Sequence, residues 1–392
     1  MSINGERLMK TVKVAMSILT LIVVFFSCQG GSDSSDDGAT RSFYMGFTPW
    51  PYAATVQAVT DVYAFINAEG DLVAHHFQQG VPFTASDISD FSTYHENIRN
   101  EINGRTGATA SGRVIYLAID SLNSGRNDLT DLWGSNGNMD RPDPWDARGF
   151  GSAEVIQAYI DFSTVVIEKF RTEYGTLPAY FNYGTEISEL MINEPGKYTD
   201  YYTHFAPQVY SAIKAAYPSI KLMVSIALKS PGSAEMNTVT TGFTHIKDYV
   251  DVVGISTYGY AFYGHADKGN PDNLPSDWIT QVTTIAPGKP YGVTETGWIG
   301  EDLSIPAYTL NVFSDGDAQD RYLQKLFAES NDLLDAEMII WFTSYDFDTL
   351  WTDTLGQDNV SKIWKDTGLI DENFNERPGL DTWEQWKALE RR

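Results

Sequence analysis

Two glutamates each follow a short run of apolar, β-branched and aromatic residues. Glu295 follows the run Pro-Tyr-Gly-Val-Thr at 290–294, and Glu186 follows the run Ala-Tyr-Phe-Asn-Tyr-Gly-Thr at 179–185. A buried parallel strand is typically a continuous apolar run, so each carboxylate is expected at the rim of a sheet, where α/β barrels carry their chemistry. Two carboxylates that flank one bond supply the acid/base and the nucleophile of glycoside hydrolysis.

The two glutamates would have different roles. We expect Glu295 to be the nucleophile, which must stay ionised. We expect Glu186 to be the acid/base, which must hold a proton because burial and its neighbour's charge raise its pKa. A gap of about 5 Å between the carboxyl groups would give retention of configuration. Alternatively, each glutamate is an exposed carboxylate at a strand end, but their places on the fourth and seventh strands favour a catalytic pair.

The elements that must position this pair alternate between apolar runs and longer amphipathic segments, which is typical of βα units. Strands are predicted at 43–47, 72–77, 114–119, 180–184, 222–228, 252–256, 291–294 and 338–343. The clearest helices are predicted at 153–174, 201–217, 318–334 and 380–389, with Asp200 and Asp317 as N-caps. Eight strands with intervening helices in about 350 residues predict a single α/β domain, a (β/α)₈ TIM barrel.

The composition limits the classes of molecule that the protein is expected to bind. The chain has 392 residues and a formal charge of −25, from 27 basic and 52 acidic residues, so its field would repel nucleic acid and anionic lipid. A neutral substrate fits better. The 10 Trp and 22 Tyr supply flat rings suited to stacking on sugars, although many of them belong to the core. We expect a monomer that binds a polysaccharide or oligosaccharide, with no cofactor and no metal.

The first 27 residues are predicted to be a signal peptide. A basic segment precedes an apolar stretch at 14–26 that is too short to span a membrane in the mature protein. Phe25-Phe26-Ser27-Cys28 resembles a bacterial lipobox, which implies a lipid anchor on Cys28, the only cysteine. Ordinary signal cleavage is the alternative.

The residues after Cys28 have the composition of a flexible acidic tether, which we place at 28–40, before the domain at 41–392. The acidic stretch resembles the export signal of surface lipoproteins. We therefore expect an outer-membrane or cell-surface lipoprotein, with a periplasm-facing location as the alternative.

Three motifs resemble those of clan A retaining glycoside hydrolases. They are Phe-Asn-Tyr-Gly-Thr-Glu-Ile at 181–187, Asp-Val-Val-Gly-Ile-Ser-Thr-Tyr at 251–258 and Val-Thr-Glu-Thr-Gly-Trp at 293–298. Their layout is most similar to the endo-β-1,4-galactanase family, over roughly residues 180–300. The resemblance implies that Glu186 is the acid/base and Glu295 the nucleophile. It also implies that Tyr258 hydrogen-bonds the nucleophile and that Trp341 is the aromatic platform under the reacting sugar. Trp298 is a further candidate for a sugar subsite.

Three more residues are candidates for substrate binding. His75 and His76 end the second strand, and we expect His76 to face the mouth of the barrel. Thr185 stands where the clan carries an Asn that binds the sugar 2-hydroxyl, a departure that puts the galactanase substrate in doubt. Asp120 ends the third strand and is expected to bind a substrate hydroxyl.

Metal binding is not favoured. His75 and His76 are adjacent in a strand and point opposite ways, so they cannot readily share a metal. Asp-Gly-Asp at 315–317 and Asp-Phe-Asp at 346–348, the latter with Asp353, offer oxygen ligands for calcium. Neither has the spacing of a known loop, and we interpret both as solvated acidic turns.

These observations together favour a retaining, endo-acting glycoside hydrolase that cleaves a β-linked polysaccharide of the β-glucan or β-galactan class by double displacement. One alternative is a surface lipoprotein with the same barrel that binds glycan without cleaving it. Another is an inverting or transglycosylating enzyme.

Overall fold

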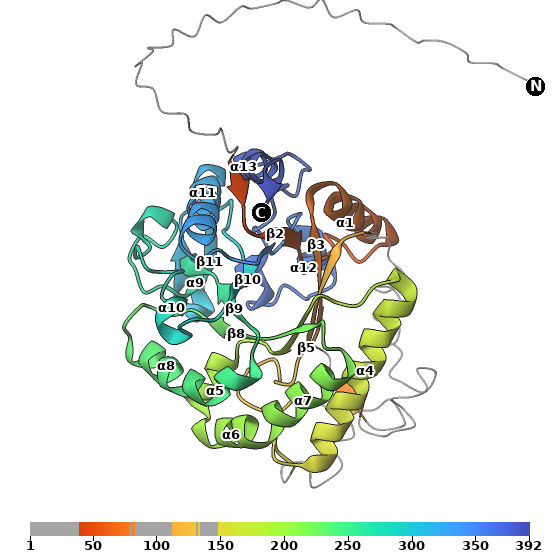
Figure 1. Ribbon diagram of the computed structural model, residues 1–392. Coiled ribbons are helices and arrows are strands. Elements are labelled where there is room, and N and C mark those ends of the chain that lie inside the picture. Colours follow the sequence, from red (N-terminus) through yellow and green to blue (C-terminus); the bar gives the residue numbers. More distant parts are fainter. Residues whose placement is uncertain (1–38, 79, 83–111, 131, 134–147) are drawn as a thin grey trace, which may run out of the picture. The chain divides into compact units, whose positions relative to one another are not determined.

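A computed structural model describes residues 39–78, 80–82, 112–130, 132–133 and 148–392. Eight parallel strands form a closed barrel, which confirms the predicted fold class (Figure 1). In barrel order the strands are β2 (Tyr44–Phe47), β3 (Leu72–Phe77), β5 (Val114–Ile119), β7 (Tyr180–Gly184), β8 (Lys221–Ala227), β9 (Val252–Thr257), β10 (Tyr291–Thr296) and β13 (Met338–Trp341).

The helices surround the strands (Figure 1). They are α1 (Val56–Glu69), α4 (Ala153–Tyr174), α5 (Ile187–Asn193), α6 (Pro195–Asp200), α7 (Ala206–Ala216), α8 (Ala234–Ile246), α9 (Gly259–Phe262), α10 (Val282–Ile285), α11 (Gly316–Asp332), α12 (Asp348–Asp353) and α13 (Pro378–Lys387). Short strand pairs join β1 (Thr40–Arg41) to β14 (Glu390–Arg391), β4 (Val81–Pro82) to β6 (Leu132–Trp133), and β11 (Leu303–Ile305) to β12 (Leu310–Val312).

The predicted helices are all present, but their bounds differ in three of the four cases. Helix α7 begins five residues later than predicted, and α11 and α13 begin and end two residues earlier. Helix α4 has the predicted bounds and ends at Gly175, whose φ of 73° suits glycine. Asp315, and not Asp317, caps α11 by accepting a hydrogen bond from the Ala318 backbone N–H. Asp200 makes no side-chain cap, because it ends α6 and leads directly into a π-helical turn.

The alternation of side chains along each strand separates two apolar layers. Even-numbered residues of β5 and β13, such as Tyr116 and Ile340, fill the inside of the barrel. Odd-numbered ones, such as Leu117 and Ile339, pack between the strands and the helices. Because both faces of these strands are apolar, their sequences do not show which residues face inward.

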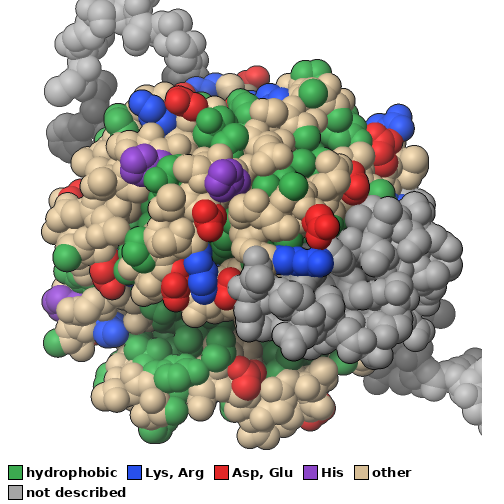
Figure 2. Space-filling view, turned by 90° about the horizontal axis from the view of Figure 1, so that it is seen from below, with side chains coloured by type: hydrophobic (Ala, Val, Ile, Leu, Met, Phe, Trp, Pro, Cys, Tyr) green, Lys and Arg blue, Asp and Glu red, His purple; other side chains and the backbone are tan. Residues whose placement is uncertain are grey.

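The described residues contain no helix that is both long and apolar enough to span a membrane. Figure 2 shows acidic and basic side chains interspersed on one face of the molecule. Cys28 and the central part of the long polar loop at 123–149 lie outside the described residues.

Candidate active site

Glu295 lies within β10 and not just after it, because the strand continues to Thr296, two residues beyond the predicted end. The pairing with β9 shifts register between Val293 and Glu295, an irregularity of the kind that re-aims side chains beside active sites. The hydroxyl of Tyr258 donates to Glu295 Oε1 over 2.8 Å. This is the contact that the clan resemblance implies for Tyr258.

Glu186 follows β7 and begins α5 in a left-handed conformation, with φ 52° and ψ 40°. Its backbone N–H donates to Ser225 Oγ over 2.8 Å, which holds this strained turn in place. Its carboxylate accepts from Ser256 Oγ over 2.7 Å. Ser256 is also the register partner of Glu295 in the β9–β10 pair, so this one serine connects the two glutamates at the barrel mouth.

Arg126 connects Glu186 to a buried ionic network. Its Nε lies 3.3 Å from Glu186 Oε2, and its Nη1 contacts Asp120 Oδ2. The other oxygen of Asp120 lies 2.7 Å from His76 Nε2. The side chain of Asp120 is only 1% exposed, whereas that of Glu186 is 25% exposed. The network therefore presents Glu186 to solvent and keeps Asp120 behind it.

These contacts set the charge states of the site. Burial opposes the charge on Asp120, but Arg126 and His76 outweigh it and hold the pKa of Asp120 at about 2. Burial and the negative charge of Glu186 raise the pKa of Glu295, against the opposing effects of His76, Tyr258 and Arg126. Burial and the charge of Glu295 raise the pKa of Tyr258 well above its usual value, so this phenol remains a hydrogen-bond donor.

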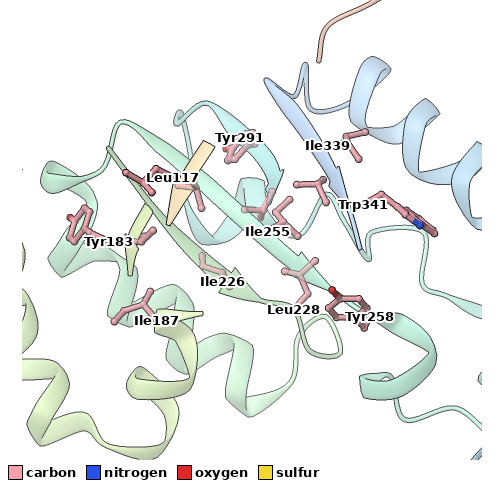
Figure 3. Packing of buried hydrophobic residues seen from close by; sticks show 14 of the residues in the cluster. Leu117, Tyr183, Ile187, Ile226, Leu228, Ile255, Tyr258, Tyr291, Ile339 and Trp341 are labelled. Atoms are coloured by element: carbon pink, nitrogen blue, oxygen red, sulfur yellow. The ribbon is translucent and has the colours of Figure 1, made fainter. Parts of the chain in front are cut away.

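The prediction that Trp341 is the aromatic platform is wrong for this structure. Met338 and Ile340 face the inside of the barrel, so Trp341 points outward, as Figure 3 shows. It is fully buried, its indole N–H donates to Thr367 O, and its ring packs near Tyr322 of α11. The alternation instead turns Phe342, which is partly exposed, toward the mouth.

Trp298 and Thr185 are also enclosed. Trp298 is fully buried, and its ring stacks on Tyr322 at a centroid distance of 4.7 Å. Thr185 is 4% exposed, and its hydroxyl oxygen is shielded from solvent. Neither side chain offers a surface to a sugar in this structure, so their predicted roles in substrate binding are not supported.

The structure changes the role expected of Asp120 but agrees with the orientation expected of His76. Both oxygens of Asp120 are engaged by His76 and Arg126, so its position favours orienting those two groups over binding a substrate hydroxyl. His76 does face the mouth, with its side chain 14% exposed, while His75 is fully buried on the opposite side of β3 against Phe170. The strand alternation accounts for the difference between the two histidines.

Two acidic clusters among the described residues could be considered for a metal, and they share Asp346. The first consists of Glu301, Asp346 and Glu372, and Arg377 contacts both Glu301 and Asp346 in it. The second lies just beyond β13. Asp346, Asp348 and Asp366 have oxygens within 4.8 Å of one another. Asp346 is buried, so the interpretation as a solvated turn is wrong there. However, Lys365 contacts both Asp348 and Asp366, and Arg377 lies 2.6 Å from Asp346. The chain's own cations fill the cluster, which leaves no open position for a metal ion.

A cavity of about 650 Å³ lies at the other end of the barrel. Tyr44, Tyr180, Lys221 and Lys289, which line it, come from the N-terminal ends of strands or the residues just before them. It contains none of the predicted site residues, and barrel enzymes carry their chemistry at the opposite, C-terminal end of the strands. The cavity is therefore not the candidate active site.

Sequence reasoning missed Arg126 and Ser256. Arg126 lies in a polar loop and has no motif around it, and its φ of 55° is rare for a residue other than glycine. A signal for Ser256 was present in the sequence. It stands two residues before Tyr258 in the motif at 251–258, which places both side chains on the same face of the strand.

Comparisons with known proteins bear on the fold. No protein-family model and no curated protein sequence matches the chain. Among solved structures, xylanase 10B of Thermotoga maritima is 14% identical, with a TM-score of 0.55, over 88% of this chain and 95% of that one. β-Glucuronidase of Bifidobacterium dentium, complexed with coumarin-3-O-glucuronide, is 12% identical, with a TM-score of 0.53, over 88% of this chain and 46% of that one.

A third structure, Bacteroides uniformis β-glucuronidase 2 covalently bound to cyclophellitol-6-carboxylate aziridine, is 11% identical, with a TM-score of 0.52. The match covers 88% of this chain and 35% of the glucuronidase chain. The chain thus spans about half or less of the two glucuronidases. At these identities the likeness shows the fold alone, a TIM barrel, and the similarity to galactanases stays a prediction.

Proposed function

We propose that this protein is a retaining glycoside hydrolase that cleaves a β-linked polysaccharide by double displacement. The observation that carries the proposal is the convergence of Glu186 and Glu295 at the ends of the fourth and seventh barrel strands. Each carboxylate has a dedicated hydroxyl donor, Ser256 or Tyr258. Two carboxyl groups that converge on one site, one as nucleophile and one as acid/base, are what this reaction needs.

In the first step the Glu295 carboxylate attacks the anomeric carbon while Glu186 transfers its proton to the glycosidic oxygen. The leaving sugar departs, and a glycosyl ester on Glu295 remains. In the second step Glu186 removes a proton from water, which attacks the same carbon and releases Glu295. Burial and the charge of Glu186 raise the pKa of Glu295, which runs against the expectation that this carboxyl group is the ionised partner. The assignment of roles is therefore supported by the strand positions and by the hydrogen bond from Tyr258 to Glu295.

The covalent complex of the B. uniformis glucuronidase supports the same route, because such an adduct needs an enzyme nucleophile, the role that we assign to Glu295. The substrate class is the finer part of the proposal. We propose a β-glucan or β-galactan and endo action, and the similarity to a xylanase makes xylan a further polysaccharide to test.

The experiment is to replace Glu186 and Glu295 by Gln separately and to follow reducing-sugar release from β-glucans, galactans, mannans and xylans. We expect loss of activity by about a thousandfold or more in each variant, because each carboxyl group is chemically required. Full activity in either variant would remove the mechanism. Proton NMR of the first-formed anomer separates retention from inversion, and binding without turnover by the wild-type protein would favour a glycan-binding role.

We also propose that Cys28 carries the lipid anchor and that the protein is displayed on the outer membrane or the cell surface. The support is the lipobox-like sequence at 25–28 and the acidic tether after it. Metabolic labelling with an alkyne fatty acid should mark the wild-type protein and not the Cys28→Ser variant. Protease accessibility on intact cells separates surface display from a periplasm-facing location.

A further inference from the structure

Partly exposed aromatic rings form two neighbouring sets on the segments that follow β2 and β13. Trp50 lies 5.6 Å from Phe342, measured between ring centroids. Two residues further along the chain, Tyr52 lies 5.4 Å from Tyr345 and 5.2 Å from Phe374. We call Trp50, Tyr52, Phe342, Tyr345 and Phe374 the aromatic track. None of these five side chains is fully buried.

Phe374, at the outer end of the track, is costly for folding alone. Its ring is 60% exposed, and its φ of 63° is unfavourable for a bulky residue by roughly 1–2 kcal/mol. The turn that presents it is fixed, since Asp371 accepts hydrogen bonds from the backbone N–H groups of Asn373 and Asn375. An exposed ring on a strained but well-anchored turn indicates a binding role.

The inner end of the track reaches the candidate active site. The Phe342 N–H donates to the carbonyl of Thr296, the residue after Glu295. Trp50 follows β2, whose neighbours in the barrel are β3 and β13. The track therefore starts beside the nucleophile and extends outward from the β2 and β13 side of the mouth.

This side is opposite to Glu186 in the barrel. Strands β13 and β2 lie across the circle from β7, which Glu186 follows. Glu186 must stand at the glycosidic oxygen to protonate the leaving group. The sugar that is attacked, and the chain attached to its non-reducing side, then lie away from Glu186.

We propose that the aromatic track binds the glycone side of a polysaccharide chain, with the outer sugars stacked on Tyr52 and Phe374. The inference rests on the proposed function and deepens it, because several glycone subsites suit a polymer better than a short glycoside. Tyr and Phe rings match the apolar faces of pyranose sugars and lose little conformational entropy on binding.

The test uses ladders of cello-, xylo-, manno- and galacto-oligosaccharides from two to six sugars, chosen by the polysaccharide that the wild-type protein cleaves. In Phe374→Ala we expect the ratio of kcat/KM for the hexasaccharide to that for the disaccharide to fall about tenfold. Phe374→Leu should show the same fall, since it keeps an apolar side chain without a flat ring, and Phe374→Trp should preserve the ratio. Leu333→Ala, a 62% exposed side chain just after α11, is the control.

Cleavage of hexasaccharide labelled at its reducing end gives a second readout. Loss of glycone subsites should move the cleavage point so that fewer sugars lie on the non-reducing side. An unchanged kcat/KM ratio and cleavage pattern in both Phe374→Ala and Phe374→Leu would overturn the inference. If the wild-type protein cleaves no polysaccharide, the proposed function fails instead. In that case, affinity electrophoresis in gels that contain the same polysaccharides tests glycan binding by the aromatic track without any cleavage. If the polysaccharide retards the wild type and Phe374→Ala equally, the inference is refuted.

Discussion

Replacement of Arg126 by Met tests the electrostatic argument about the site without needing a substrate. The guanidinium lies between Asp120 and Glu186, and Asp120 is almost fully buried. Methionine keeps most of the side-chain length but removes the charge. Asp120 then keeps its burial and loses the guanidinium, and His76 is left as its remaining side-chain partner.

The size of the effect follows from the pKa of Asp120, which moves from its ordinary 3.8 to about 2. At 1.36 kcal/mol per pKa unit, this shift is worth about 2.5 kcal/mol of folding free energy. Because the pKa is lowered in the folded state, the contribution is present above pH 3.8 and is lost as the pH falls toward 2. Because Arg126 supplies only part of this shift, we expect Arg126→Met to lose roughly 1–3 kcal/mol at pH 7.

Urea denaturation of both proteins between pH 7 and pH 3 measures the difference. The gap in unfolding free energy should narrow steadily below about pH 4, where Asp120 becomes protonated in the variant. Asp120→Asn is the matched control, and Arg126→Met should cost less in that background. A gap that is the same at every pH would mean that Arg126 acts only by packing, and the electrostatic reasoning would be wrong.

Three further outcomes are expected. Glu295→Gln should be more stable than wild type by roughly 1–3 kcal/mol at pH 7, because a carboxyl group whose pKa is raised by folding makes the protein less stable as the pH rises. Thermal melts should show the difference in stability closing below pH 4.5. Equal melting temperatures at all pH values would contradict this. Tyr258→Phe should lower kcat about tenfold to a hundredfold through loss of the hydrogen bond to Glu295, with unchanged circular dichroism, and wild-type kcat would refute the role. Trp341→Phe should lower the melting temperature, at a cost of roughly 1–3 kcal/mol, and leave KM unchanged, whereas a raised KM would restore Trp341 as a sugar platform.

The fold class and the two candidate glutamates could be predicted from local sequence patterns. Apolar runs of strand length, separated by helical segments, are sufficient for the fold class because burial of both strand faces leaves few other arrangements. Glu186 and Glu295 were found because a charged residue that interrupts or ends such a run must lie at the rim. The expectations for Tyr258 and His76 came from the resemblance to clan A glycoside hydrolases together with their places at strand ends.

Only the tertiary structure decided which residues face the mouth and which partners hold the carboxylates. Both faces of β13 are apolar, so its sequence does not show whether Trp341 or Phe342 points inward. A shift of the in–out alternation by one residue exchanges their positions. Arg126 reaches Glu186 from a loop 60 residues earlier in the chain. No local pattern encodes such a contact, because its energy arises from burial and from charges that folding alone brings together.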